Sequence, residues 1–345
     1  MKILNLTIIL LLSVSALLLS SCSSSSSSFT KMSPIDSSSK RVALVIGVED
    51  YAGDNDLIGI YKDVSKVSSL FSSWGFTVNR LSNSLNLKSV LSAYSRTLGK
   101  NDILIVYYSG HGTSISDRDG DEIDGKDEAL VLSNGMQNEY LIDDAFNLYL
   151  NSIQARKLII IDSCHSGTIY KSFNATRIAT NITPIKTSVD SIYTSIIPAI
   201  SIYHTSNKSS TSNIIEYNKQ KELEAKQQIE NKLLSKSLIK EGRVKYLKSS
   251  EVPKDYSLNY GSYIPATKLS GEYVFFGATQ DNEKSIATNT GSIFTNVFVN
   301  KSDTSKTINT IYRDVSRSIS DFHPSLSSSN SSLKNYTMND YLKMR

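Results

Sequence analysis

Ile103-Leu-Ile-Val-Tyr-Tyr-Ser-Gly-His-Gly112 decides the fold of this chain, together with Lys157-Leu-Ile-Ile-Ile-Asp-Ser-Cys-His-Ser-Gly167. In each stretch an apolar run bounded by Gly and Ser is typical of a strand buried on both faces within a parallel sheet. Each predicted strand leads directly into a reactive side chain, His111 in one and Cys164 in the other. Because ligands bind outside the carboxyl ends of strands in open α/β sheets, we expect both side chains in one cleft.

The rest of the chain predicts an alternating series of strands and helices. Besides strands at 103–108 and 157–162, we expect strands over 41–48 and 76–81, another beginning at Tyr273, and helices over 60–74, 87–98, 142–153 and 307–319. A long acidic loop is expected between the strand at 103–108 and the helix at 142–153. This alternation predicts an α/β fold with a mostly parallel central sheet and helices on both faces.

A thiol and an imidazole in one cleft favour nucleophilic acyl transfer. A thiol with a pKa of about 8.5 is only a few per cent ionised near neutrality, so it needs a base, and His111 can supply one. The backbone N–H groups of Gly112 and Cys164 are candidates for stabilising the oxyanion. His165 is the rival base, but adjacent side chains at a strand end point in different directions. An inert core thiol beside a turn histidine is the structural alternative.

The motifs Tyr108-Ser-Gly-His-Gly112 and Asp162-Ser-Cys-His-Ser-Gly167 resemble those of caspase-like cysteine peptidases, and most closely those of the metacaspase branch. The His precedes the Cys at roughly the family spacing of about 50 residues. The likeness extends to 41–48, to Tyr273-Val-Phe-Phe-Gly-Ala-Thr279 and to Gly291-Ser-Ile-Phe-Thr295. The resemblance implies a caspase-like fold and a peptidase with His111 and Cys164 as its catalytic pair, which needs no cofactor for its chemistry.

The same resemblance assigns Asp63, Ser109 and Asp162 to the pocket that binds the substrate side chain preceding the cut bond. Carboxylates suit a guanidinium or ammonium group, so the implied cut follows Arg or Lys. Ile60 and Lys62 depart from the family pattern, in which many relatives have Cys and Asn. The structural alternative for Asp63 is a carboxylate near a helix N-terminus, where the helix dipole favours it.

Residues 117–128 crowd seven carboxylates into twelve positions. Such a loop either stays solvated or binds a hard cation. An EF-hand is excluded because Glu122 stands where that loop requires Gly. The resemblance implies that Asp127, Asp143 and Asp144 bind an activating calcium ion, although Lys171 stands where a fourth ligand is expected. A calcium site and a solvated loop that shapes the cleft are both open.

The first 22 residues resemble a bacterial lipoprotein signal peptide. The apolar stretch from Ile8 to Leu19 is too short to span a bilayer comfortably, and the small residues before Cys22 are typical of a cleavage site. Lipidation of Cys22 would leave a Ser-rich tether and a protein anchored to the membrane. Ser23 resembles the outer-membrane sorting pattern of Gram-negative lipoproteins, which predicts a lipid-anchored protein of the bacterial cell envelope. An ordinary secretory signal with an incidental Cys22 is the alternative.

The number of cysteines and the net charge limit which functions the protein can have. Cys22 and Cys164 are the chain's two cysteines, so lipidation of the first leaves the second unpaired in an oxidising compartment, which favours a nucleophile. The formal net charge is +4, and no basic tract is interleaved with aromatic residues. We therefore expect no nucleic-acid partner.

The composition divides the chain into successive parts: a signal peptide (1–21), a lipidated Ser-rich tether (22–39), a caspase-like large part (40–170), a Lys/Ser-rich insertion or linker (171–260), a small part (261–320) and a polar tail (321–345). One exposed helix is expected within 214–240. In relatives the segment between the large and small parts is often cut during maturation. Lys219 to Lys248 offers many basic sites there without singling out one bond.

Together these features predict a membrane-tethered cysteine endopeptidase that acts on protein or peptide substrates after basic residues. One alternative is a catalytically silent caspase-like lipoprotein that serves as a binding scaffold at the envelope, which would require a broken core motif. Another is a peptidase with Asp specificity, which would require a basic pocket in place of Asp63 and Asp162.

Overall fold

β3 (Ile103–Ser109) and β7 (Arg156–Asp162) are the two central strands of a six-stranded sheet. The computed structural model describes residues 39–116, 125–164, 166, 242–253, 269–280 and 283–343. Every residue of both central strands is buried. Since both faces of such a strand pack against other elements, its sequence is a continuous apolar run without alternation.

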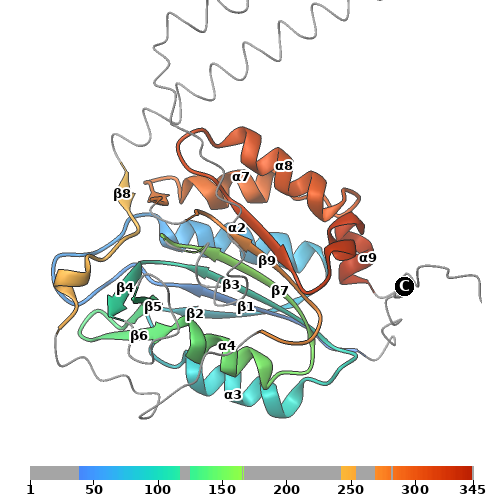
Figure 1. Ribbon diagram of the computed structural model, residues 1–345, viewed down its shortest axis with the longest axis horizontal. Coiled ribbons are helices and arrows are strands. Elements are labelled where there is room, and N and C mark those ends of the chain that lie inside the picture. The colour runs from blue at the N-terminus through green and yellow to red at the C-terminus, as the bar shows by residue number, and fades with distance from the viewer. Residues whose placement is uncertain are drawn as a thin grey trace, which may run out of the picture. The chain divides into compact units, whose positions relative to one another are not determined.

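The sheet is completed by β1 (Arg41–Gly47), β2 (Thr77–Ser82), β9 (Tyr273–Gly277) and β11 (Ser325–Ser328), in the order β11-β9-β7-β3-β1-β2. All neighbouring pairs are parallel except β9 and β11 (Figure 1). The register aligns Gly47 with Ser109 and Ser109 with Asp162 at the carboxyl ends of the strands. The predicted α/β fold with a mostly parallel sheet is confirmed.

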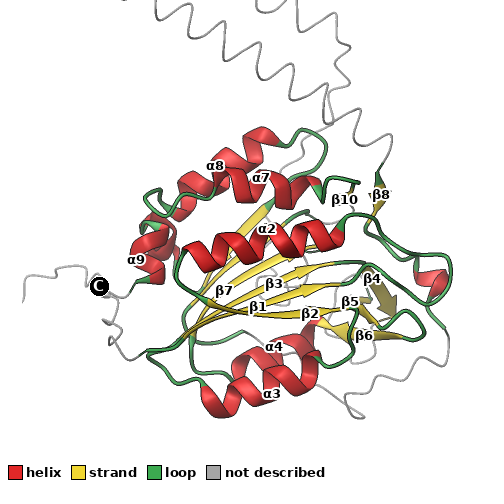
Figure 2. Ribbon diagram, turned by 180° about the vertical axis from the view of Figure 1, so that it is seen from behind, coloured by secondary structure: helices red, strands yellow, loops and turns green. Residues whose placement is uncertain are grey.

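Helices cover both faces of the sheet, as predicted. α2 (Ile60–Ser73), α7 (Ile293–Lys301) and α8 (Ile308–Ser318) lie on one face, and α3 (Leu87–Thr97) and α4 (Asp143–Asn151) lie on the other (Figures 1 and 2). In α2 the buried apolar residues recur at helical spacing and form one stripe: Ile60, Val64, Val67 and Phe71. Burial of this stripe against β1 and β2 holds the helix on the sheet.

Two segments are more ordered than predicted. The expected acidic loop contains a separate three-stranded antiparallel sheet, formed by β4 (Gly112–Ser116), β5 (Lys126–Ser133) and β6 (Asn138–Ile142). The expected polar tail contributes β11 to the main sheet and then forms a 3₁₀ turn, η2 (Ser331–Asn335), and α9 (Met338–Leu342).

Part of the expected linker also has a defined position. β8 (Arg243–Val244) pairs with β10 (Ile286–Ala287), and a 3₁₀ turn, η1 (Ser249–Glu251), follows. Several predicted features lie outside the described residues, namely the signal peptide with Cys22, most of the tether, His165, Lys171 and the helix within 214–240.

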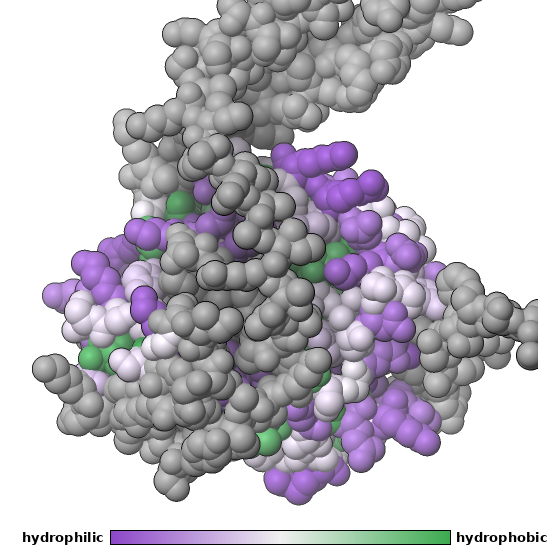
Figure 3. Space-filling model, in the orientation of Figure 1, coloured by the Kyte–Doolittle hydropathy of each residue, from purple (hydrophilic) through white to green (hydrophobic). Residues whose placement is uncertain are grey.

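The described surface is largely hydrophilic on the face shown in Figure 3, with apolar residues scattered over it. The large hydrophobic side chains that are exposed among the described residues are Tyr61, Met136, Leu148 and Val244. None of the helices in the described part of the chain is long and apolar enough to cross a membrane.

Candidate active site

His111 and Cys164 lie at the same edge of the main sheet. Each comes two residues after its strand ends, and the two strands are neighbours whose last residues, Ser109 and Asp162, are paired. Both side chains are buried. The register of the parallel sheet therefore brings together two reactive groups that are 53 positions apart in the sequence.

The imidazole of His111 is held by a backbone carbonyl. Its Nε2 lies 2.7 Å from the carbonyl oxygen of Asn55. Because a carbonyl can only accept, Nε2 carries the proton and Nδ1 carries the lone pair. Nδ1 is buried with no hydrogen-bond partner among the described groups, and burial lowers the pKa of His111. The ring is therefore neutral near pH 7 and has one nitrogen free to accept a proton.

Tyr51 and Tyr108 fix the backbone around this histidine. The hydroxyl of Tyr51 accepts a hydrogen bond from the N–H of His111 at 2.7 Å, and the two rings pack with their centroids 4.5 Å apart. The hydroxyl of Tyr108 donates to the carbonyl of His111 at 2.8 Å. A side chain at Gly110 would collide with both tyrosine hydroxyls, because a Cβ there would lie 2.5 and 2.7 Å from them.

The sulfur of Cys164 contacts the backbone of Ser285. The N–H of Ser285 donates to Sγ at 3.2 Å, and Sγ lies 3.7 Å from the carbonyl oxygen of the same residue. Burial raises the pKa of the Cys164 thiol to about 12. In this arrangement the sulfur is a thiol, so Cys164 would need a base in order to act as a nucleophile.

The backbone of Lys245 occupies the space between the two motifs. Its carbonyl oxygen accepts hydrogen bonds from the N–H of Gly112 at 3.0 Å and from the N–H of Cys164 at 3.4 Å. These are the two N–H groups that the sequence suggested for an oxyanion. A side chain at Gly112 is excluded, since its Cβ would lie 2.3 Å from the carbonyl oxygen of Cys164.

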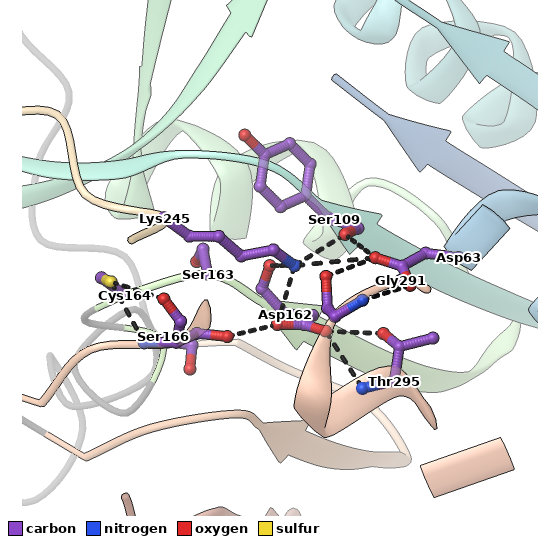
Figure 4. Close-up of polar contacts among 12 residues, drawn as sticks. Asp63, Ser109, Asp162, Ser163, Cys164, Ser166, Lys245, Gly291 and Thr295 are labelled. Carbon is purple, nitrogen blue, oxygen red and sulfur yellow. Dashed lines mark hydrogen bonds and ion pairs between the residues drawn. The ribbon is translucent and has the colours of Figure 1, made fainter. Parts of the chain in front are cut away.

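The side chain of Lys245 enters a buried acidic pocket (Figure 4). Its Nζ lies 2.9 Å from Oδ1 of Asp162 and 3.9 Å from Oδ2 of Asp63. The same Nζ donates to Oγ of Ser109 at 2.7 Å. All four residues have no exposed surface. The three residues predicted to bind a substrate's basic side chain thus surround a lysine of the chain itself.

Hydroxyl groups from the second half of the chain hold the two carboxylates in place. Asp162 accepts from Oγ of Ser285 and from Oγ1 of Thr295, both at 2.6 Å. Asp63 accepts from the N–H of Ser292 at 2.7 Å and from its hydroxyl. Burial raises the pKa of Asp63, and the nearby Lys245 opposes this rise.

Sequence reasoning missed several of these residues. Ser292 and Thr295 lie within Gly291-Ser-Ile-Phe-Thr295, a stretch that contributes to the family resemblance without indicating a function for either residue. A buried carboxylate requires hydrogen-bond donors, so the hydroxyl groups of this motif are the sequence signal that could have identified them. Asn55 acts through its backbone carbonyl, a group that every residue has, so the sequence cannot indicate this role. Lys245 is one of many lysines in a polar segment.

Arg243–Val252, which we call the inserted segment, passes through the site with its first part extended and ends in the turn η1. On one side of Lys245, β8 pairs antiparallel with β10. On the other side, Tyr246 bridges to Gly112, and the N–H of Leu247 donates to the carbonyl of Gly112 at 3.0 Å. Leu247 is only 1% exposed. This is the way a peptide bound by strand addition lies, with main-chain hydrogen bonds along its length and side chains in pockets.

The three predicted calcium ligands do not form a metal site by themselves among the described residues. Asp127 lies in β5, and Asp143 and Asp144 are buried in the first turn of α4, where the helix dipole favours a negative charge. Among the described residues, no group of three or more His, Cys, Asp or Glu side chains is arranged to hold a metal ion. Residues 117–124 of the acidic run lie outside the described part.

Comparison with known families finds one model that matches nearly all of the described chain. Residues 40–337 match the model described as Caspase domain (Peptidase_C14). This range includes both motif strands, the inserted segment and the helix that carries Thr295.

Individual relatives match a shorter stretch. Metacaspase-1 of Scheffersomyces stipitis is 30% identical over 152 residues, and Metacaspase-1 of Pyricularia oryzae is 31% identical over 149 residues. Each match covers 38% of this chain and 37% of the relative, so the chain spans little more than a third of their length. Among solved structures, protein GSU0716 from Geobacter sulfurreducens shares the fold, with a TM-score of 0.53 at 19% identity over 84% of this chain and 93% of that one.

Proposed function

The chain belongs to the Caspase domain family of peptidases, and from that premise we propose that it is a cysteine endopeptidase that cuts after Lys or Arg. One observation carries the proposal. The ammonium group of Lys245 lies against two buried carboxylates while its carbonyl oxygen accepts from two backbone N–H groups beside the Cys164 thiol. A peptidase has to hold the residue before the cut bond at both of these points.

The charge of the pocket supports a basic residue at this position. Asp63 and Asp162 are both fully buried, and one ammonium group neutralises only part of their combined negative charge. A carboxylate in the same place would add a third negative charge in a site of low dielectric. This argues against the Asp-specific alternative, while the planar guanidinium of Arg could bond both carboxylates.

In the proposed mechanism, Nδ1 of His111 takes the proton of the Cys164 thiol as Sγ attacks the carbonyl carbon. The negative charge that develops on the carbonyl oxygen is stabilised by the N–H groups of Gly112 and Cys164. The C–N bond then breaks, and the His111 imidazolium gives its proton to the leaving amine. Water, activated by the same imidazole, hydrolyses the thioester and restores the thiol. The carbonyl of Asn55 keeps the ring in the required tautomer throughout.

The test compares peptides that differ only in the residue before a fluorogenic group, which is Lys, Arg, Gln or Asp. After prolonged incubation of the full chain, we expect cleavage of the Lys and Arg peptides that is lost in Cys164→Ala. Asp162→Asn should reduce kcat/KM for Lys much more than for Gln. The silent-scaffold alternative predicts no cleavage of any of these peptides by a folded protein, and preferred cleavage of the Asp peptide would overturn the basic specificity.

The mechanism above assigns each step to residues of the chain and to water. The activation implied for Asp127, Asp143 and Asp144 stays a prediction. Measuring peptide cleavage with added calcium and with a chelator tests it.

We also propose that the protein is tethered to the bacterial envelope through a lipid on Cys22, with the outer membrane as its destination. The support is the apolar stretch that ends at Leu19-Ser-Ser-Cys22. Mass spectrometry of the mature N-terminus should find an acylated Cys22. Cys22→Ser should move the protein from the membrane fraction to the soluble fraction, and an unmodified Cys22 inside a longer mature chain would contradict the anchor.

A further inference from the structure

We propose that the peptidase also selects its substrates on the leaving side of the cut bond, by binding a large aliphatic side chain such as Leu two residues after that bond. This rests on the proposed peptidase function and deepens it by naming a second part of the substrate. The side chain of Leu247 shows the position, which we call the leaving-side subsite.

The burial of the inserted segment points to this position. Within residues 242–253, Lys245 and Leu247 are the two buried residues. The acidic pocket explains the burial of Lys245. Leu247 is only 1% exposed, although Lys248, the next residue, has a side chain that is 73% exposed. A peptide that lies along this path therefore buries a second side chain, two residues after its basic one.

Gly112 fixes the distance between the two buried side chains. Its N–H donates to the carbonyl of Lys245, and its own carbonyl accepts from the N–H of Leu247, both at 3.0 Å. The carbonyl of Lys245 also accepts from the N–H of Cys164, the residue that bears the thiol. A peptide whose basic residue occupies the acidic pocket thus presents its second following residue to the carbonyl of Gly112.

The open edge of β4 receives this part of the peptide. β4 is the outer strand of the three-stranded sheet, and β5 pairs with it on its inner side. The inserted segment bridges to β4 in parallel between Tyr246 and Gly112, and η1 lies beside the same strand (Figure 1). Successive side chains of an added strand point to opposite faces, so the two residues after the cut bond face different surroundings.

The surroundings of Leu247 are apolar where it meets β4. Since Gly112 is the bridged residue, Leu247 shares a face of the sheet with Thr113 and Ile115. Ala129 of β5 is paired with Thr113 and lies on that face as well. Leu247, Ile115 and Ala129 belong to one cluster of buried hydrophobic residues. The leaving-side subsite therefore suits an aliphatic side chain, and a polar one would lose its hydration there.

A carboxylate on the same face makes an acidic residue the least suitable. Asp127 is buried and is paired with Ile115, so it lies on this face farther along β5. A second carboxylate close to it in surroundings of low dielectric would be repelled. A Lys is the competing choice, because its stem is apolar and its charge is opposite to that of Asp127.

The experiment measures kcat/KM of the full chain for quenched fluorogenic peptides in which Lys is followed by Tyr and then by Leu, Ala, Lys, Asp or Pro. We expect the Leu peptide to exceed the Ala peptide at least about tenfold, because the subsite buries the larger side chain. Asp should be cut most slowly. Pro is apolar but has no N–H for the carbonyl of Gly112, so it should also be cut slowly. Mass spectrometry of the products identifies the bond that is cut.

Two controls separate the subsite from a general preference for apolar peptides. Peptides containing Lys-Ser-Leu and Lys-Leu-Ser have the same composition, and the first should be cut at least about tenfold faster. Ile115→Ala should lower the ratio of the Leu rate to the Ala rate. Leu148→Ala, which shortens an exposed aliphatic side chain of α4, should keep the wild-type ratio. Thermal unfolding checks that both variants fold, and the peptide series itself requires no variant.

Each outcome distinguishes this inference from the proposed function. If the peptides are cut after the first Lys at equal rates, or if Lys or Asp is preferred over Leu in the subsite, the inference is overturned while the proposed function stands. Equal rates for Lys-Ser-Leu and Lys-Leu-Ser would overturn it in the same way. If none of these peptides is cut, and a fluorogenic Lys peptide without residues after the bond is not cut either, the proposed function fails.

Discussion

Gly112 combines two requirements in one residue. Its N–H donates to the carbonyl of Lys245, and its Cα lies so close to Cys164 that an added Cβ would come within 2.3 Å of a backbone oxygen. Alanine keeps this N–H, but the clash would move it away from the oxygen it bonds. We therefore expect Gly112→Ala to lower kcat at least about 100-fold, the usual effect of losing one oxyanion donor, and also to lower the Tm. Gly99→Ala is the control, since a Cβ there would meet no atom within 4 Å. Peptide hydrolysis and thermal unfolding measure the two effects, and wild-type activity in Gly112→Ala would contradict this role.

His111 sets the expected response to pH. Burial lowers its pKa below the usual value of about 6.5, so the neutral base persists to a lower pH than for an exposed imidazole. Activity should therefore be present above that lowered pKa and be lost as pH falls through it. Protonation of Asp63, whose pKa burial raises, would weaken binding of the basic side chain in the same direction. Profiles of kcat and of kcat/KM against pH separate the two groups, and an acid limb of kcat at or above pH 6.5 would contradict the expectation.

Lys157 is a buried cation at the opposite end of β7. It is 2% exposed, and burial lowers its pKa to about 8. At neutral pH the folded chain bears the cost of a poorly solvated charge, so Lys157→Met should raise the free energy of unfolding by roughly 1–3 kcal/mol. This advantage should shrink as pH rises from about 8 toward about 10.5, because the folded wild type loses the proton first. Urea unfolding measures it, with exposed Lys100→Met as the control, and equal gains in both variants would contradict the explanation.

At the residue scale, the reactive residues at the strand ends could be predicted from the sequence. The residues that hydrogen-bond the buried carboxylates beside them could not. Apolar runs that end in His111 and Cys164 predict the edge of a parallel sheet, and the structure brings Asp63, Ser109 and Asp162 together beside them. Ser285, Ser292 and Thr295 come from the second half of the chain, over 100 positions later, so no local pattern links them to the carboxylates they bond.

Among the elements, the polar C-terminal segment differs most from its prediction. Five of its large hydrophobic side chains are buried: Phe322, Leu333, Met338, Tyr341 and Leu342. The Tyr341 hydroxyl donates to the carbonyl of Lys157 at 2.6 Å, which fastens α9 to the start of β7. Burying each large apolar side chain contributes about 1.5–3 kcal/mol, so the set is comparable with the whole stability of a domain.

We therefore expect a chain that ends at Ser320 not to fold. Circular dichroism and thermal scans should find no cooperative unfolding, whereas a chain shortened by only its last two residues should unfold as the wild type does. A cooperative transition in the longer truncation would mean that the segment is dispensable.

The reason that this segment and β4–β6 escaped prediction is physical. β11 reads Ser-Leu-Ser-Ser, a sequence of low intrinsic strand preference that pairs because β9 offers an open edge. β5 follows a run of carboxylates, and its pairing with β4 and β6 is decided by tertiary contacts that single-chain periodicity does not record. The central strands and α2 could be predicted without such context, because the spacing of apolar residues in their own sequences indicates which faces are buried.

At the scale of the whole molecule, a cut made by added trypsin within 171–241 would leave two pieces that share one sheet. β7 belongs to the first piece and β9 to the second, and they pair from Lys157 with Tyr273 to Ile161 with Gly277. We expect the two fragments to elute together in gel filtration and to separate only in denaturant. Fragments that separate without denaturant would mean that this strand pairing does not survive the cut.

The inserted segment has one more consequence, which concerns competition. Lys245 lies between Asp63 and Asp162 and is covalently attached to the chain that forms this pocket. Its local concentration therefore does not depend on how much protein is made. A free peptide has to displace it, so the apparent affinity for the peptide is reduced by the fraction of molecules in which Lys245 occupies the pocket.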